Sequence, residues 1–150
     1  MAHWLMKTEP DAFSIRDLRV METSCWDGVR NYQARNFMRQ MQIGDGVFIY
    51  HSSCKEVGIA GIARVVKAAY PDHSQFDPDS PYHDPKASPD QPRWFMVDVA
   101  FERAFDKVIP LSLLKANPAL AELALCKKGS RLSVMPVSEP EWQAILAMAP

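Results

Sequence analysis

The sequence predicts an α+β domain built on a curved or closed mixed sheet of about five or six strands. Three observations support this fold class. Residues 94–101 alternate with the two-residue period of a strand. An apolar segment at 47–52 and a segment rich in β-branched and small residues at 59–69 are joined by a short turn, as in an antiparallel pair. Helical segments separate the strands without a repeated β-α-β rhythm, and 150 residues fit one domain.

The first forty residues are predicted to hold one strand and two helices. A strand covers residues 3–7, and Pro10 follows it. Ser14 can cap a short helix that runs through Val20, because its hydroxyl can accept from a free N–H group of the first turn. A clearer helix covers residues 31–41, with Asn31 as its N-cap. Its apolar residues follow helical spacing and would face the core: Ala34, Phe37, Met38 and Met41.

The central pair of strands is predicted at 47–52 and 59–69, with residues 53–56 as the hairpin loop. Gly58 and Gly61 lie in or beside the second strand. Glycine in a strand predicts a bulge or a close approach of another backbone.

The C-terminal half begins with a segment, residues 71–92, whose six prolines exclude helix and interior strand. Residues 111–125 predict one or two short helices with a break near Asn117-Pro118. Residues 131–137 predict a further strand. A capping box at residues 138–141 then opens a last amphipathic helix, whose inward residues are Trp142, Ile145 and Leu146.

Composition places the chain among ordinary globular proteins, with 47% apolar and 23% charged residues. No apolar run approaches the ~20 residues that span a bilayer, and the first residues do not resemble a secretory signal. Cys25, Cys54 and Cys126 are odd in number and widely spaced, so they suggest neither disulfides nor a zinc site. We therefore expect a cytoplasmic protein with reduced thiols, no cofactor and no membrane association.

The net charge of −1 conceals an uneven distribution. Residues 24–67 carry six basic and three acidic side chains, and residues 91–131 carry seven and four. Between these blocks, residues 71–90 carry one basic and five acidic side chains. A protein that binds nucleic acid through phosphates alone is usually more basic. If this chain binds nucleic acid, a local pocket must supply much of the affinity.

The sequence contains no pattern typical of a metal site or of a known catalytic motif. The Asp and His residues of the proline-rich segment are unevenly spaced and match no zinc or calcium template, so no metal site is predicted. No nucleophile elbow, phosphate-binding loop or dinucleotide fingerprint occurs. Asp98 lies in an apolar strand and is expected to pair with a base such as Arg93 or Arg131.

The most unusual segment is 24–31, in which Trp26 precedes Asp-Gly and a helix start. An indole at a loop edge offers a flat face for a base, and base–aromatic stacking contributes roughly 1–3 kcal/mol. The free N–H groups of the helix start suit a phosphate or a base carbonyl. The alternative is that Trp26 is a core aromatic.

Two strand ends offer further polar groups. The segment 50–52 (Tyr-His-Ser) closes one strand, and Lys7-Thr8 closes the first. Together they could supply donors and acceptors to the edge of a ligand. The alternative is that both strand ends are simply solvated. Lys7, Thr8 and Glu9 could also support nucleophilic or general-base chemistry, although neighbouring strand residues point to opposite faces.

Several motifs together resemble those of the EVE domain family. They are WLMKTEP at 4–10, WDGVRNYQARN at 26–36, VFIYHS at 47–52, GIAGIARV at 58–65 and RLSVMPV at 131–137. The match spans nearly the whole chain, and WDGVRNYQARN is highly specific. The resemblance implies a single domain over residues 1–150. It also implies a PUA-like mixed β pseudo-barrel with peripheral helices, related to YTH domains.

The resemblance further implies a base-binding pocket, with Trp26 as one wall. The other pocket residues carried over by motif are Lys7, Thr8, Val29, Arg30, Asn31, Tyr50, His51, Ser52 and Ser133. Candidate phosphate contacts are Arg35, Arg39, Arg64 and Arg93.

The function implied is recognition without turnover of a flipped, modified nucleobase. The expected partner is DNA or RNA that carries the modified base, and the protein is expected to be a monomer. Two alternatives remain open. One is hydrolysis of a modified nucleoside, as in ASCH domains, through Lys7, Thr8 and Glu9. The other is a protein-interaction module without a nucleotide ligand.

Overall fold

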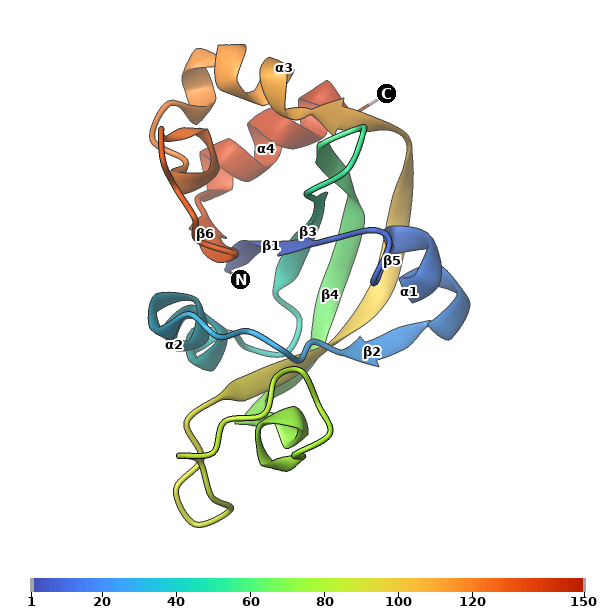
Figure 1. Ribbon diagram of the computed structural model, residues 1–150. Helices are drawn as coiled ribbons and strands as arrows, with labels where there is room; N and C mark the ends of the chain where they lie inside the picture. The colour runs from blue at the N-terminus through green and yellow to red at the C-terminus, as the bar shows by residue number, and fades with distance from the viewer. Residues whose placement is uncertain (1, 150) are drawn as a thin grey trace.

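The computed structural model describes residues 2–149 and confirms the α+β class. Six strands form one mixed sheet in the order β2-β5-β4-β3-β1-β6 (Figure 1). β1 and β3 are parallel, and the other neighbouring pairs are antiparallel. The strands are β1 (His3–Thr8), β2 (Thr23–Cys25), β3 (Gly46–His51), β4 (Gly58–Pro71), β5 (Phe95–Pro110) and β6 (Val134–Val137).

The sheet curves but stays open. β2 and β6 are its two edges and do not pair with each other, so of the two expected forms, curved or closed, the sheet takes the curved one. Both edge strands are short, with three and four residues, and short edges limit pairing with other chains.

The helices lie around the sheet, as expected. They are α1 (Ile15–Met21), α2 (Tyr32–Gln40), α3 (Leu111–Ala116) and α4 (Glu139–Met148). All three predicted caps are confirmed, because Ser14, Asn31 and Ser138 accept from the backbone N–H groups of Asp17, Ala34 and Glu141. Single 3-10 turns occupy His73–Phe76, Pro118–Leu120 and Ala124–Cys126.

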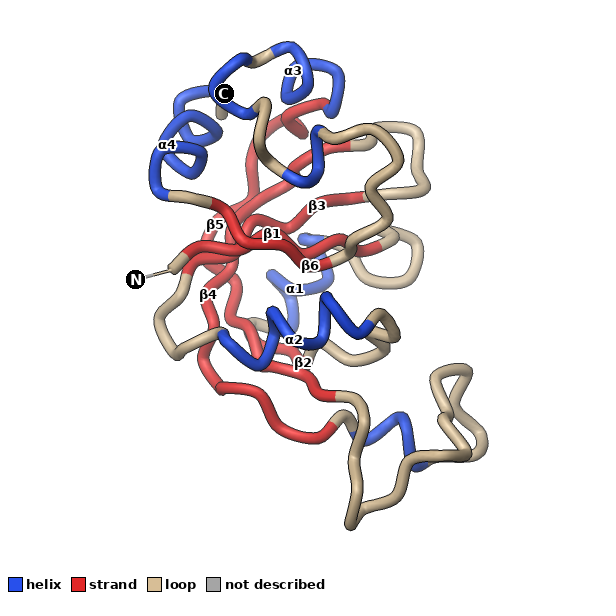
Figure 2. The backbone as a smooth tube through the Cα atoms, turned by 90° about the vertical axis from the view of Figure 1, so that its left-hand side faces the viewer, coloured by secondary structure: helices blue, strands red, loops and turns tan. Residues whose placement is uncertain are grey.

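The two faces of the sheet carry separate apolar clusters, because strand residues alternate in direction. On β1, Trp4 and Met6 join one cluster while Leu5 joins the other. The first cluster also takes the buried residues of α1 and α2, and the second takes those of α3, α4 and the turns between them. Figure 2 shows these helix groups above and below the strands of β1 and β3. A residue's position along a strand therefore decides which helices it meets.

The two strand glycines have the predicted role. A Cβ atom at Gly58 would meet the carbonyl oxygen of Ile109, and one at Gly61 would meet that of Arg103. The β3–β4 and β4–β5 ladders shift register beside these positions. Close approach of β5 requires glycine at both sites.

Several details differ from expectation. β5 continues to residue 110, nine residues past the predicted end, because β4 supplies a partner along that length. β2 was not predicted, and β6 begins at residue 134 rather than 131. The proline-rich segment contains the turn at 73–76 despite its prolines. Asp98 pairs with neither arginine, because its carboxylate accepts from the hydroxyl of Tyr70 at 2.5 Å.

Candidate functional site

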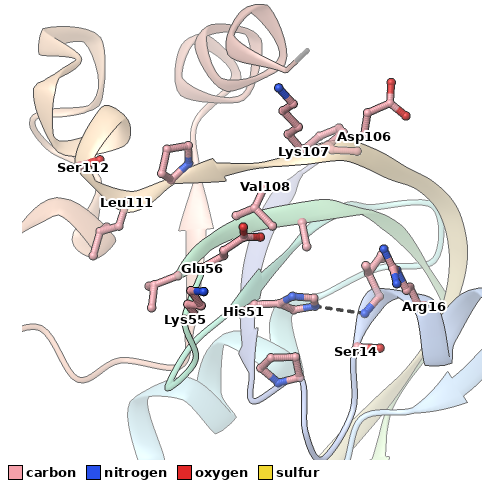
Figure 3. A pocket seen from close by; sticks show the side chains of 16 residues that line it. Ser14, Arg16, His51, Lys55, Glu56, Asp106, Lys107, Val108, Leu111 and Ser112 are labelled. Atoms are coloured by element: carbon pink, nitrogen blue, oxygen red, sulfur yellow. Dashed lines mark hydrogen bonds between the residues drawn. The ribbon is translucent and has the colours of Figure 1, made fainter.

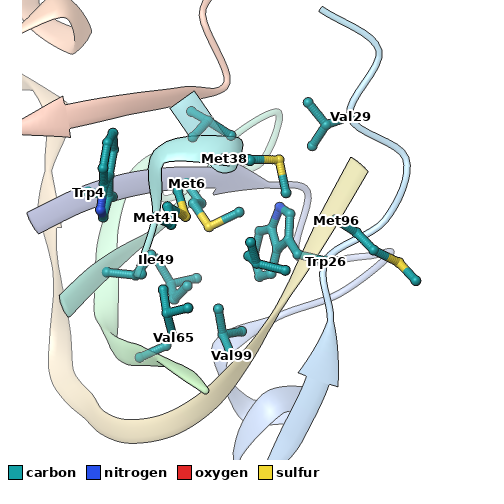
Figure 4. Packing of buried hydrophobic residues seen from close by; sticks show 14 of the residues in the cluster. Trp4, Met6, Trp26, Val29, Met38, Met41, Ile49, Val65, Met96 and Val99 are labelled. Carbon is teal, nitrogen blue, oxygen red and sulfur yellow. The ribbon is translucent and has the colours of Figure 1, made fainter. Parts of the chain in front are cut away.

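Trp26 begins the segment that joins β2 to α2. Its N–H donates to the carbonyl of Val97 at 2.8 Å, which continues the β2–β5 pairing. The side chain is 7% exposed and packs with Val29 and Met38 in the first apolar cluster (Figure 4). The ring of Phe13 meets the indole edge to face at 6.0 Å. Most of the indole surface is therefore covered, and Trp26 is not an open wall.

The indole N–H of Trp26 is nevertheless free. Within residues 2–149 it donates to no acceptor, whereas Trp4 and Trp94 donate to Asp45 and Asp84 at 2.9 and 2.8 Å. In the same range, the one fully buried side-chain polar atom without a partner is Nδ1 of His3. The N–H of Trp26 is thus left without an acceptor among the described residues.

Arg30 connects this segment to the proline-rich segment. Its guanidinium donates to the carboxylate of Asp72 at 3.1 Å, to the hydroxyl of Ser74 at 3.0 Å and to the carbonyl of Tyr82 at 2.7 Å. The Arg30 side chain is 22% exposed and that of Asp72 is fully buried. The N–H donors of Arg30 are thus used to hold the two segments together, and the structure shows no free donor at Arg30 for the expected base pocket.

Asp72 is the centre of that connection. It also accepts from the N–H of Gly28 at 2.8 Å and from the N–H and hydroxyl of Ser74. Burial by itself would raise the pKa of Asp72, but the hydrogen bonds from Ser74, Gly28 and Arg30 together hold that pKa below its ordinary value. Asp72 is thus a stable buried carboxylate that fixes the path of residues 26–31.

A hollow of about 440 Å³ opens beside the start of α2. Asn31 and Gln33 form one side, and the segment 124–132 forms the other. Lys127, Lys128 and Arg131 lie on this segment, and none of the lining residues is acidic. Lys127 pairs with Glu122 at 3.4 Å on the exposed surface, which leaves Lys128 and Arg131 without an ion pair among the described residues. The hollow is therefore electropositive.

Lys7, Tyr50 and Ser133 come together at the far end of β1. Lys7 is opposite Tyr50 in the parallel register, and its ammonium lies 5.7 Å from the centre of the Tyr50 ring. The backbone N–H of Lys7 donates to the carbonyl of Ser133 at 2.8 Å. Burial lowers the pKa of Lys7 and, with smaller contributions from Cys54 and Cys126, raises that of Tyr50 to about 12.

Thr8 and Ser52 have mainly structural contacts. The Thr8 hydroxyl donates to the carbonyl of Phe13 at 2.8 Å. The backbone N–H of Ser52 donates to the carbonyl of Thr8 at 2.9 Å, and its hydroxyl approaches the same oxygen at 3.5 Å. These bonds extend the β1–β3 pairing past the end of β3.

His51 lines a different and larger hollow, of about 1010 Å³ (Figure 3). Its Nε2 accepts from the backbone N–H of Ile15 at 3.1 Å, where α1 begins. Burial lowers the pKa of His51. Tyr50 belongs to the second apolar cluster, whereas His51 meets α1 on the opposite face. The expectation that Tyr50 and His51 face one cavity is therefore wrong, because adjacent strand residues alternate.

The four arginines predicted to contact phosphates have different partners in the structure. Arg64 forms an ion pair with Glu102, and Arg93 lies 4.0 Å from Asp84. Arg35 donates to the carbonyl of Arg93 at 2.9 Å and to the side chain of Asn36, while Arg39 lies over the ring of Phe95 at 4.7 Å. Neither Arg35 nor Arg39 has a carboxylate partner among residues 2–149. These two arginines retain uncompensated charge.

The sheet thus divides the ten expected pocket residues. Only Asn31 lines the electropositive hollow, and its neighbours there were missed. Lys127-Lys128-Gly129, followed by Arg131, was the available signal, since a basic run with a glycine suggests a charged loop. No helix within residues 2–149 is long and apolar enough to cross a membrane. In the same part of the chain, no three His, Cys, Asp or Glu side chains gather as a metal site would require.

Known proteins share this sequence and fold. The EVE domain model matches residues 2–148. Human thymocyte nuclear protein 1 is 45% identical over 98% of this chain and 73% of its own length. A protein structure from Pseudomonas syringae has a TM-score of 0.97 and 56% identity, covering 98% of this chain and 99% of the other.

The human THYN1 protein, solved in complex with 5-methylcytosine-containing DNA, has a TM-score of 0.94 and 44% identity over 99% of this chain and 97% of the other. An ASCH protein from Zymomonas mobilis, at 9% identity and a TM-score of 0.55, shares the fold alone. These similarities extend along the whole described chain and agree with its motifs. The chain belongs to the EVE domain family, with a PUA-like fold.

Proposed function

We propose that this protein binds nucleic acid and receives one extruded, modified base, without turnover, in the hollow between α2 and residues 124–132. The observation that carries the proposal is the hollow itself. Its volume of about 440 Å³ lies within the ~300–1,000 Å³ range of small-molecule sites. Its lining combines lysine and arginine side chains with the amide groups of Asn31 and Gln33 and has no carboxylate.

The relatives support the kind of ligand. The human THYN1 protein, which shares 44% of its residues with this chain and nearly all of its fold, was solved with DNA containing 5-methylcytosine. In this chain, α2 and the basic segment 124–132 would face a phosphate backbone. We take 5-methylcytosine as the first modified base to test here.

The chemistry required is positioning. Extrusion of a base costs a few kcal/mol, and less from a single strand. Lys128 and Arg131 would offset part of that cost through the flanking phosphates. The Asn31 side-chain oxygen is used by the cap on Ala34, so its amide NH₂ is the group left to meet a base edge. Trp26 does not line the hollow, and its N–H is proposed only as a second donor to the extruded base, in place of a stacking face.

Discrimination by a methyl group alone would be small. Burial of one carbon contributes about 0.8 kcal/mol, so a larger preference needs a hydrogen bond that differs between the two bases. We therefore expect binding to depend on both base and backbone.

Absence of turnover is supported by the positions of Lys7 and Thr8. They project from opposite faces of β1, and the Thr8 hydroxyl is engaged by the Phe13 carbonyl at 2.8 Å. A nucleophile and base cannot act together from these places. The nucleoside-hydrolase alternative therefore lacks an assembled centre in residues 7–9.

Three further features belong to the proposal. The protein acts as a monomer, because one chain supplies every group named above. Its partner is DNA or RNA, since the amide and hydroxyl groups of Asn31, Gln33 and Ser130 can meet the backbone or base edges of either. It works in the cytoplasm, where its three free cysteines stay reduced.

The test is fluorescence anisotropy with single-stranded DNA and RNA 9-mers that carry one 5-methylcytosine or one cytosine. The wild type should prefer the modified probes. Lys128→Gln and Arg131→Gln should each lower affinity and flatten the dependence of log affinity on log salt by about 0.7 for each phosphate that the variant no longer neutralises. Lys115→Gln, at an exposed lysine of α3, is the matched control. Equal affinities for all three variants would refute the assigned site, and release of free base from a modified nucleoside would refute the absence of turnover.

A further inference from the structure

The first residue of α2, Tyr32, is the outermost layer of an aromatic stack. It is 52% exposed, and its ring lies on that of Trp94 with centres 4.8 Å apart and an angle of 24° between planes. An exposed tyrosine usually moves freely, whereas this one rests on a large buried neighbour.

Trp94 is held rigidly beneath it. The indole N–H donates to the carboxylate of Asp84 at 2.8 Å, and the backbone N–H donates to the side-chain carbonyl of Gln75 at 2.9 Å. Arg30 lies 5.3 Å from the Trp94 ring and 5.6 Å from that of Tyr82. Because these contacts fix Trp94, little conformational freedom remains to be lost when a ligand packs on Tyr32.

With one face of its ring on Trp94 and half of the residue exposed, Tyr32 has ring surface left for a ligand. The guanidinium of Arg35 is 4.8 Å from the centre of Tyr32 and 6.0 Å from that of Trp94. If the guanidinium covered the face of Tyr32 that points away from Trp94, its distance to the Trp94 ring would be about twice its distance to the Tyr32 ring. Arg35 therefore lies beside the stack and adds positive charge at its edge.

We propose that Tyr32 is a stacking platform for the nucleotide that flanks the extruded base, with Arg35 at its phosphate. This inference rests on the proposed function and adds a second contact to the same site. Asn31 and Gln33, on either side of Tyr32 in sequence, line the electropositive hollow. The platform and the hollow thus both lie at the first turn of α2.

The distribution of charged side chains indicates the path of the bound nucleic-acid strand. Asp72 and Asp84 pair with Arg30 and Arg93 at 3.1 and 4.0 Å, but the exposed Asp77, Asp79 and Asp90 of the proline-rich segment repel phosphates. Figure 2 shows that segment on the opposite side of α2 from β6. The nucleic-acid strand therefore runs from Tyr32 toward Lys128 and Arg131. Tyr32 is more than half exposed, so its substitution should leave the fold intact.

The experiment compares the wild type with Tyr32→Ala and Tyr32→Phe. The probes are the 5-methylcytosine DNA 9-mer, its RNA counterpart, two DNA versions with an abasic site directly 5′ or 3′ of the modified base, and free 5-methyl-2′-deoxycytidine. Tyr32→Ala should weaken binding of an intact 9-mer roughly tenfold. Tyr32→Phe should keep the affinity, since the ring remains. One of the abasic probes should bind the wild type and Tyr32→Ala equally, and the free nucleoside should not distinguish the variants.

Equal binding of the intact 9-mers by the wild type and Tyr32→Ala overturns the platform. Lys128→Gln, measured in parallel, tests the hollow separately. A loss with Lys128→Gln and none with Tyr32→Ala refutes the platform alone, and the reverse result refutes the proposed hollow while leaving the platform supported. A wild type that binds no probe overturns both.

Discussion

The ring of Tyr82 lies directly over Gly28, so that a Cβ atom at residue 28 would be 2.7 Å from Cζ of that ring. Gly28 also has φ +81°, in the left-handed region that favours glycine. Two separate constraints, one of backbone conformation and one of space, therefore act on the residue between Trp26 and Arg30.

Gly28→Ala should destabilise the protein by more than the ~1–2 kcal/mol expected from φ alone. Gly44→Ala is the matched control, because Gly44 has φ +97° and no neighbour within 4 Å of the added Cβ. Urea unfolding of both variants gives the two free energies. In the double variant Gly28→Ala, Tyr82→Ala, the Gly28→Ala change should cost no more unfolding free energy than Gly44→Ala costs in the wild type. Equal losses in the two single variants would contradict a steric role for Tyr82.

Asp72 should give the protein an acid-sensitive component of stability. The pKa of Asp72 is lower in the folded protein than in the unfolded protein, where it is near 4. The contribution of Asp72 to the free energy of unfolding is therefore complete above about pH 4 and disappears as the pH falls toward the pKa of the folded protein. Removing the carboxylate leaves Arg30 unpaired at a half-buried site, which costs about 3–5 kcal/mol. Asp72→Asn should therefore be less stable at pH 7 and lose less stability than the wild type between pH 5 and pH 3. Parallel pH profiles for the two proteins would count against this role.

His51 should give a second pH dependence at a higher pH. Its Nε2 accepts from the N–H of Ile15, and burial lowers its pKa below the ordinary value near 6.5. Because the pKa of His51 is lower in the folded protein than in the unfolded protein, neutral His51 contributes fully to stability above pH 6.5. This contribution is lost as the pH falls toward the pKa of His51 in the folded protein. The melting temperature should fall between pH 7 and pH 5 in the wild type. His51→Gln, whose side-chain carbonyl can accept the same bond, should remove this part of the slope, and an unchanged slope would show that His51 does not titrate in this range.

Trp26 should matter to folding as well as to binding. Trp26→Ala leaves a cavity among Val29, Met38 and Phe13 and should cost about 3–5 kcal/mol. Trp26→Phe keeps a ring in the cluster and should cost less, but it removes the free N–H. We expect Trp26→Phe to fold cooperatively in urea and to bind the 5-methylcytosine 9-mer more weakly than the wild type. Unchanged affinity in folded Trp26→Phe would exclude the N–H edge from the site.

The sequence by itself determined the local structure. The caps at Ser14, Asn31 and Ser138 depend on residues three positions apart, and the alternation at 95–101 depends on a two-residue period. Such signals are complete within a short segment and need no distant partner. Together with the family motifs, they were enough to place most of the helices and strands and to identify the EVE domain.

Only the tertiary structure decided which side chains meet. Arg30 finds Asp72 across 42 residues, Asp98 takes Tyr70 rather than an arginine, and the sheet separates Tyr50 from His51. The hollow joins Asn31 to a basic segment about a hundred residues further along the chain. These contacts depend on strand order and on the face that each residue takes, and neither is encoded in the residues that flank the contact.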